Sequence, residues 1–290
     1  MSDTELASNV GKYVDYTPVS GSFTSEGKYN GRSNQNFSTI TGLEWRILDA
    51  NNNKLTLISE TAANTNFTLY GANGYNNGVL LLNNACTSMY SNSSLGATGR
   101  SLNIDDIEAV SNYNKNNNSN YEGDYIGEYG EEYFPSHRYY PDIFADELTG
   151  APNGTYGTKY GLSNQDRYVT GIASGNSSFK GKWTYYTFTM STSTMDTQTY
   201  VDLLCSSSST WTWLASRCVA YGVTANGRFD FSMFYVGANI VDANYLYYSN
   251  DSSFGLSYAI RPVVEIDLSK VNIGLTGDGG VDTPFSIEAK

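Results

Sequence analysis

Two apolar stretches near the end of the chain decide the fold: Trp211-Thr-Trp-Leu-Ala-Ser-Arg217 and Ile260-Arg-Pro-Val-Val-Glu-Ile266. Both are rich in aromatic and β-branched residues, which predicts two strands. Some forty residues separate them, and ten of these are aromatic: Tyr221, Phe229, Phe231, Phe234, Tyr235, Tyr245, Tyr247, Tyr248, Phe254 and Tyr258. Stiff aromatic rings interleaved with Gly, Ser, Asn and Asp are typical of recognition surfaces. The pattern therefore predicts a rigid β frame that displays a binding face.

The overall composition is that of a β- and loop-rich extracellular protein. The chain has 290 residues, enough to bury a sizeable core, and 25 of them are tyrosine. Charged residues make up only 16%, against roughly 25% in an average globular protein. We therefore expect an extracellular, cell-surface or virion location. The first residues lack the basic start and apolar core of a signal peptide, so a signal or anchor would lie outside this sequence.

The charge balance narrows the range of partners. A net charge of −12 opposes binding to nucleic acid, whose phosphates require clusters of Lys and Arg. The same charge opposes binding to anionic membrane surfaces. The longest apolar runs, such as residues 79–82, are far too short to span a bilayer. We expect no nucleic-acid partner and no direct insertion into a membrane.

Cysteine and histidine usage gives no sign of a metal or a cofactor. Cys86, Cys205 and Cys218 lie far apart, and His137 is the single histidine. No pair of these residues has the spacing of a zinc site. The sequence therefore predicts no metal site and no cofactor. Buried free thiols are favoured for the cysteines, while a disulfide between Cys205 and Cys218 stays open.

The first sixty residues read mainly as strands. Alternation over 10–20 predicts a strand that ends at Pro18, and the polar residues 21–41 predict a loop. The apolar runs 43–48 and 54–59 flank three consecutive asparagines at 51–53. Asparagine tolerates the left-handed conformations of tight turns, so these runs predict a β-hairpin.

The middle of the chain turns helical and then becomes irregular. Spacings of three to four predict a helix through Val79, Leu82, Cys86 and Met89, capped by Asn76 or Asn77. Acidic residues near its start favour a second helix within 101–110. The remaining expectations are a loop-rich insertion at 111–182, a strand at 182–190, a short helix or strand at 199–204, and a flexible C-terminal tail at 274–290. One α+β domain spanning 1–290 accounts for these elements.

The order of these elements resembles the C-type lectin fold. The likeness is sharpest at Trp213 to Arg217 and at Arg261 to Val264, and it covers roughly residues 10–270. More narrowly, the chain resembles bacterial and phage surface proteins of this fold, among them the variable proteins of diversity-generating retroelements. The resemblance implies an α+β, C-type-lectin-like fold with antiparallel strands, two helices and loop-rich insertions. It also implies an adhesion or receptor-binding role without enzymatic activity.

In such proteins the strands form a scaffold, and a variable segment between them contacts the ligand. The resemblance implies that strands 211–219 and 260–266 are scaffold and that 220–258 is a hypervariable, ligand-contacting region. Retroelement diversification acts on adenines and does not generate Lys, Glu, Gln or Trp from asparagine codons. Residues 220–258 contain none of these four, although 61–107 also lack them. The sequence has neither the Glu-Pro-Asn nor the Trp-Asn-Asp motif of calcium-dependent lectins, so calcium-dependent sugar binding is not expected.

The ligand-contacting residues follow from this division. We expect no catalytic residues and a partner that is a protein or a glycan on another surface. The candidate ligand-binding residues are Tyr221, Arg228, Asp230, Phe234, Tyr235, Asn239, Asp242, Asn244, Tyr245, Tyr247, Asn250, Asp251, Phe254 and Tyr258. The alternative for the rings is an ordinary core, because aromatic residues at a period of two often face inward.

Arginines and tryptophans near this region favour structural roles. Arg217 and Arg261 are expected to hold loops through bonds to a carboxylate or to carbonyl groups, with ligand anchoring as the alternative. Tryptophans set in strands are more often core than platform. This applies to Trp45, Trp183, Trp211 and Trp213.

Two other functions remain open. The aromatic rings would equally serve a structural subunit, such as a pilus or capsid-decorating protein, by packing against neighbouring subunits. A glycosidase would need paired carboxylates, which Glu131, Glu132, Asp142, Asp146 and Glu147 could supply. His137 beside Ser136 does not suggest a catalytic pair, because triad members usually come from distant parts of a chain. A solvated acidic loop accounts equally well for the carboxylates.

Overall fold

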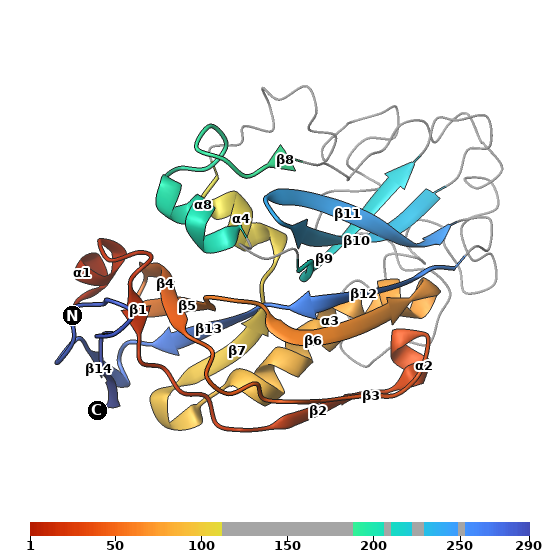
Figure 1. Cartoon of the computed structure of the whole chain (residues 1–290). Coiled ribbons are helices and arrows are strands. Elements are labelled where there is room, and N and C mark those ends of the chain that lie inside the picture. The colour runs from red at the N-terminus through yellow and green to blue at the C-terminus, as the bar shows by residue number, and fades with distance from the viewer. Residues whose placement is uncertain (112–187, 206–209, 222–228, 249–252) are drawn as a thin grey trace.

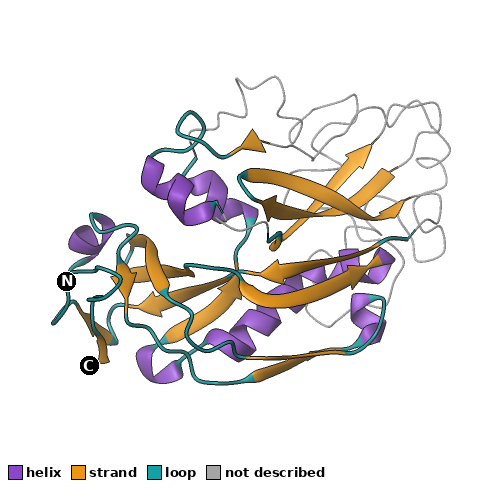
Figure 2. Cartoon of the chain, in the orientation of Figure 1, coloured by secondary structure: helices purple, strands orange, loops and turns teal. Residues whose placement is uncertain are grey.

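A computed structural model shows a mixed α+β protein built mostly from antiparallel sheets (Figures 1 and 2). The structure describes residues 1–111, 188–205, 210–221, 229–248 and 253–290. The insertion expected at 111–182 lies almost wholly outside the described residues, as does most of the strand expected at 182–190. His137 and the carboxylates at 131–147 also fall outside them.

One sheet has five strands, and all its pairings are antiparallel. In spatial order they are β1 (Tyr13–Val14), β4 (Trp45–Asn51), β5 (Lys54–Ser59), β13 (Pro262–Asp267) and β7 (Ala97–Ser101). The hairpin predicted around the asparagines is confirmed as β4 and β5. Asn52 and Asn53 form its turn with φ of 48° and 61°, which asparagine adopts more easily than most residues. The strand expected over 10–20 is reduced to β1.

The second sheet has six strands, and its pairings are antiparallel except that between β12 and β9. In order they are β6 (Ala63–Tyr70), β12 (Gly255–Ile260), β9 (Thr212–Tyr221), β10 (Phe229–Gly237), β11 (Ile240–Tyr248) and β8 (Phe188–Thr189). The strand predicted at 211–219 is confirmed as β9. The strand predicted at 260–266 is two strands, because the chain leaves one sheet and enters the other at Arg261.

The helices confirm some expectations and correct others. They are α1 (Asp3–Ala7), α2 (Gly27–Asn30), α3 (Gly71–Tyr90), η1 (Ser93–Leu95), α4 (Ile104–Ala109) and α8 (Gln198–Leu204). The long helix begins at Gly71, so the prediction of a cap at Asn76 or Asn77 is wrong. Both asparagines are buried inside the helix, and the Asn77 amide donates to the carbonyls of Tyr29 and Asn73. The acidic second helix is confirmed as α4.

Two segments that read as irregular contain paired strands. Residues 21–41 hold β2 (Ser22–Ser25) and β3 (Gln35–Ser38), whose cross-strand pair Phe23 and Phe37 packs on Phe67. Residues 274–290, expected as a flexible tail, contain β15 (Ile287–Ala289), which pairs with β14 (Val271–Ile273). Phe285 is 5% exposed in the core beside β1. Each segment therefore folds against apolar side chains from distant parts of the chain.

The alternating side chains of β10 divide between two apolar cores. Phe231, Met233 and Tyr235 belong to the core that contains α3, which we call the α3 core. Phe234 and Val236 belong to a second core with residues of α4 and α8, which we call the α8 core. This division follows from the period of two in a strand. It decides which of the aromatic residues can reach the surface on each side of the sheet.

Candidate ligand-binding site

Three aromatic rings from β9, β10 and β12, and one from the residue just before β9, meet on the α3 side of the six-stranded sheet. We call Trp211, Trp213, Tyr235 and Tyr258 the aromatic cluster. The Trp211 ring is stacked on Tyr235, with 5.2 Å between centroids and 22° between planes. The Tyr258 ring makes a T-shaped contact with Trp211 at 5.3 Å between centroids, and its centroid lies 4.4 Å from that of Trp213 and 5.1 Å from that of Tyr235. Tyr258 therefore contacts the other three rings.

Strand register explains why these rings gather. Trp213 lies in β9 and Trp211 comes just before that strand, and both indoles contact Tyr258. Tyr235 of β10 pairs with Trp213, and Asp242 of β11 pairs with Tyr235. A Cβ atom at Gly237 would lie 3.2 Å from two indole atoms of Trp211. Because glycine has no Cβ, position 237 leaves room for the Trp211 indole.

Exposure separates one ring of the aromatic cluster from the others. Trp213 is fully buried, and its indole N–H donates to the carbonyl of Phe67 at 2.7 Å. Tyr258 and Tyr235 are 7% and 9% exposed, whereas Trp211 is 45% exposed. Two buried rings, Tyr235 and Tyr258, therefore contact the partly exposed Trp211 ring, and the buried Trp213 ring contacts Tyr258.

Polar groups of β11 hold the two tyrosines in place. The Tyr235 hydroxyl donates to Oδ2 of Asp242 at 3.0 Å, and the amide of Ala243 donates to Oδ1 at 2.7 Å. Nδ2 of Asn244 donates to the Tyr258 hydroxyl at 3.0 Å. Burial, and then the nearby Asp242 carboxylate, raise the pKa of Tyr235 well above its usual value. Both phenols therefore stay neutral hydrogen-bonding groups at physiological pH.

The structure brings together four of the predicted site residues. Tyr235, Asp242, Asn244 and Tyr258 lie in or beside the aromatic cluster. Tyr235 and Tyr258 are nevertheless buried, so the expectation that their rings are exposed is wrong. Phe234 does not, because it points to the opposite side of β10 and is fully buried in the α8 core. The prediction that Phe234 contacts a ligand at the surface is therefore wrong.

The other predicted residues of β11 and its surroundings lie apart from the aromatic cluster. Tyr247 is 6% exposed in the α3 core, 6.4 Å from Phe231, so the expectation of an exposed ring is wrong there too. Tyr245 is 39% exposed and meets the half-buried Phe254 edge to face at 4.8 Å. Asn239 is exposed in the turn between β10 and β11.

The side chains of five predicted ligand-contacting residues lie outside the described part of the structure. Tyr221 ends β9 and Asp230 lies in β10, but their side chains are outside the described part of the structure. Arg228, Asn250 and Asp251 lie wholly outside the described residues.

Trp211 is the functional candidate that sequence reasoning assigned to the core. Trp45 and Trp213 confirm that assignment with exposures of 1% and 0%, and Trp183 is outside the described residues. Two signals point to the exception. Trp211 precedes the first paired residue of β9, and Gly237 stands where a larger side chain would occupy the space of the indole.

Arg261 is a structural residue, as the sequence predicts. It is 3% exposed and joins the end of β5 to the end of α8. Its guanidinium donates to the carbonyls of Ser59 and Glu60 at 3.0 Å, to that of Leu204 at 3.1 Å, and to that of Leu203. These carbonyls satisfy the buried cation at the point where the chain passes between the sheets. Arg217 is likewise buried and lies 4.9 Å from the centre of the Tyr75 ring.

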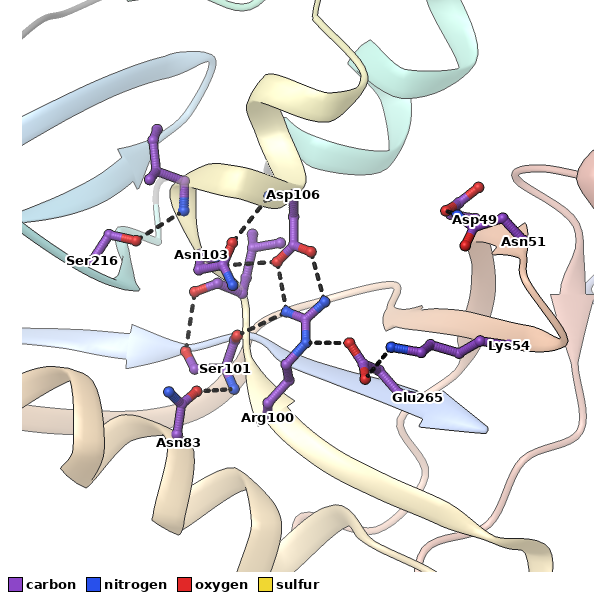
Figure 3. A network of polar contacts seen from close by, with 12 residues as sticks. Asp49, Asn51, Lys54, Asn83, Arg100, Ser101, Asn103, Asp106, Ser216 and Glu265 are labelled. Atoms are coloured by element: carbon purple, nitrogen blue, oxygen red, sulfur yellow. Dashed lines mark hydrogen bonds and ion pairs between the residues drawn. The ribbon is translucent and has the colours of Figure 1, made fainter. Parts of the chain in front are cut away.

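A polar network ties α4 to the five-stranded sheet (Figure 3). Arg100 donates to both carboxylate oxygens of Asp106, at 2.7 and 2.6 Å, and to Glu265 at 2.9 Å. Lys54 donates to the same Glu265 at 2.9 Å. The network lines a hollow of about 460 Å³. Because its cations and two of its carboxylates are paired with one another, we assign the network a structural role.

Neither a metal centre nor a reactive thiol is found in the described residues. No group of three or more His, Cys, Asp or Glu side chains is placed there to hold a metal ion. Cys86 and Cys205 are free thiols, so the structure has no Cys205–Cys218 disulfide. Burial raises the pKa of Cys205 to about 11 and that of Cys86 further still. Both thiols are therefore protonated at neutral pH.

Comparison with known proteins adds no family to this description. No protein-family model, curated protein or solved structure matches the chain significantly. Within the described residues, no helix has the length and apolar character needed to cross a membrane. Functional inference therefore depends on the site geometry.

Proposed function

We propose that this chain is a non-enzymatic ligand-binding protein with a C-type-lectin-like fold, displayed on a cell surface, on a virion or outside the cell. Its partner is a protein or glycan on another surface, and the aromatic cluster forms part of the contact. The observation that carries the proposal is the exposed indole of Trp211, held on a base of buried rings.

An exposed tryptophan in this position calls for a physical reason. Leaving a large ring in water forgoes much of the roughly 2–3 kcal/mol that burial of an aromatic side chain would contribute. Trp211 is nevertheless stacked on Tyr235 and bordered by Tyr258, so its position is defined before any partner arrives. Preorganised aromatic side chains lose little conformational entropy on binding and are frequent hot spots.

The same geometry refines the hypothesis of a diversified segment. Tyr235, Asp242, Asn244 and Tyr258 all fall within 220–258, whereas Trp211 lies before it. Diversification of 220–258 would therefore vary the groups around the indole and leave the indole itself constant. The test is nucleotide context: a near-copy of the codons for 220–258 beside a reverse-transcriptase gene, differing chiefly at adenines. Lack of such a copy would remove the hypervariability hypothesis and leave the binding role standing.

Surface binding tests the proposed function directly. The fluorescently labelled chain would be applied to a panel of bacterial and host cell surfaces, alongside Trp211→Ala and Leu275→Ala. Leu275 is an exposed apolar residue near the C-terminus, and it serves as the matched control. We expect saturable binding that Trp211→Ala weakens and Leu275→Ala preserves. Binding to no surface, or equal binding by both variants, would contradict the proposal.

Solution size tests the structural-subunit alternative. A ligand-binding protein with an exposed Trp211 is expected to sediment as a small species with accessible indole fluorescence. Ordered self-assembly that shields Trp211 from an aqueous quencher would favour the structural subunit instead.

A further inference from the structure

The Trp211 indole offers a flat surface of the size of one sugar ring. The indole is stacked on Tyr235 and makes a T-shaped contact with Tyr258, while 45% of the residue stays exposed. A pyranose carries several C–H bonds on one face and hydroxyl groups around its edge. Aromatic rings bind such apolar faces by dispersion and displacement of water, while the rim supplies hydrogen bonds.

Tyr258, whose ring contacts the indole, and its neighbour Asn244 have hydrogen-bonding groups that are only partly used. The Tyr258 hydroxyl accepts a bond from Asn244, but its own hydrogen has no acceptor among the described residues. The Oδ1 atom of Asn244 likewise has no donor there. Tyr258 is only 7% exposed, so a ligand that satisfies this hydroxyl removes the cost of leaving a largely buried donor unpaired. A donor and an acceptor on neighbouring side chains match adjacent hydroxyl groups, each of which can donate and accept.

Ring spacing argues against a cation as the ligand. An aromatic cage must hold its rings far enough apart for a cation to sit over each face, roughly within 6 Å of each centroid. Trp211, Tyr235 and Tyr258 lie only 5.1–5.3 Å from one another and touch directly. They therefore form a platform.

Patch size argues against a hydrophobic protein interface centred on Trp211. Stable interfaces bury about 800 Å² on each partner and have an apolar centre. Ile240 pairs with Gly237, next to Trp211. Among the described residues, Trp211 and Ile240 are the exposed large apolar side chains at the end of the sheet where β10 turns into β11. Two side chains are a small centre for such an interface, but they are ample for one or two sugar units.

We propose that the Trp211 platform binds a neutral pyranose unit of a glycan, with the sugar stacked on the indole and two of its hydroxyls bonded to Asn244 and Tyr258. The net charge of −12 disfavours acidic sugars. The recognition uses side chains alone and requires no bound ion. This inference rests on the proposed function and specifies its ligand.

Titration with neutral oligosaccharides tests this inference. The full chain would be titrated with α- and β-linked hexose oligomers while tryptophan fluorescence and heat are recorded, with an oligogalacturonate as the acidic control. We expect one neutral series to bind and to alter the fluorescence. Trp211→Ala should weaken this binding by about tenfold or more, and Asn244→Ala and Tyr258→Phe by about threefold to tenfold. Leu275→Ala and added EDTA should leave it unchanged.

The possible outcomes separate this inference from the proposed function. Absence of binding to every neutral oligomer, full binding by Trp211→Ala, or loss of binding in EDTA would overturn the sugar inference. If a protein ligand on a cell surface requires Trp211 while no sugar binds, the sugar inference falls and the proposed function stands. If binding to sugars and binding to cell surfaces are both independent of Trp211, the sugar inference and the proposed function are both wrong. Thermal unfolding of each variant confirms that the fold is retained.

Discussion

The indole of Trp211 lies stacked on the phenol ring of Tyr235, with 5.2 Å between their centroids and 22° between their planes. Tyr235 is itself fixed by a hydrogen bond from its hydroxyl to Asp242. The buried Tyr235 ring therefore fixes the position of the partly exposed Trp211 ring. Because Trp211 is held by Tyr235 but only partly buried, its removal should weaken ligand binding more than it lowers the stability of the fold.

Trp211→Ala and Trp213→Ala should differ sharply in stability. Trp213 is fully buried and bonded to the carbonyl of Phe67, so its removal should cost about 3–5 kcal/mol. Trp211 is 45% exposed, so its removal should cost about 1 kcal/mol or less. Urea unfolding of the two variants measures the difference. Similar losses from the two variants would show that Trp211 is part of the core and would weaken the case for a binding platform.

Gly237→Val should displace the Trp211 indole without unfolding the sheet. A Cβ at this position would lie 3.2 Å from Cδ1 and Nε1 of Trp211 and 3.3 Å from Cε2 of the buried Tyr235. The indole is exposed enough to move, and valine suits a strand. We expect weaker ligand binding and altered tryptophan fluorescence, with a smaller loss of stability than Trp213→Ala causes. Ile240→Val, on the paired residue of β11, serves as a control that should alter neither signal.

Local signals in the sequence predicted several elements correctly. The asparagine turn between β4 and β5 was predictable because asparagine adopts left-handed φ more easily than other non-glycine residues. The second helix was predictable from its acidic start, where Asn103 and Asp106 form a capping box. Strand β9 followed from its aromatic and apolar composition. In each case the deciding interaction lies within a few residues along the chain.

Elements that depend on distant contacts could not be predicted in this way. Phe234 and Tyr235 are neighbours in one strand, yet they point into different cores. No local feature of the sequence indicates which side of β10 lies closer to the surface. The β2–β3 hairpin reads as a polar loop because its few apolar side chains pack on Phe67, which lies far along the chain. Trp211 resembles Trp213 in sequence and differs from it only in what covers it.

Replacement of Arg261 should destabilise the protein strongly. Arg261→Met keeps much of the side-chain volume but leaves the carbonyls of Ser59, Glu60, Leu203 and Leu204 without their donor. We expect a loss of about 3 kcal/mol or more in the free energy of unfolding, measured by urea titration. Arg261→Lys keeps the charge with fewer donors, so its loss should be smaller. Equal losses from the two variants would show that the positive charge of lysine does not compensate for the lost guanidinium.

Glu265 should make stability depend on pH in the acid range. Burial alone would raise the pKa of Glu265, but the bonds from Lys54 and Arg100 lower it below its usual value of 4.5. The folded state therefore binds the proton more weakly than the unfolded chain. The resulting stabilisation is fully present above pH 4.5 and is lost as the pH falls through the lowered pKa. Because the carboxylate is 32% exposed, the effect should be below about 1 kcal/mol.

Comparison of wild type and Glu265→Gln at two pH values measures this dependence. The difference in unfolding free energy should be present at neutral pH and should shrink at an acidic pH below the lowered pKa of Glu265, where the wild-type carboxylate is protonated. A difference that stays constant between the two values would mean that the ion pairs with Lys54 and Arg100 do not set the pKa of Glu265.

Ala238→Gly should stabilise the turn between β10 and β11. Ala238 has φ of 51°, a left-handed conformation that costs an L-residue about 1–2 kcal/mol. Glycine removes this strain, but its greater freedom stabilises the unfolded chain by about 0.4–1 kcal/mol. The strain outweighs this entropic effect, so a net gain of about 0.5–1 kcal/mol is expected in urea unfolding. Asn52→Gly, in the β4–β5 turn with φ of 48°, is the matched control and should gain little, because asparagine already tolerates this region. An Ala238→Gly variant no more stable than Asn52→Gly would show that the turn relaxes its strain elsewhere.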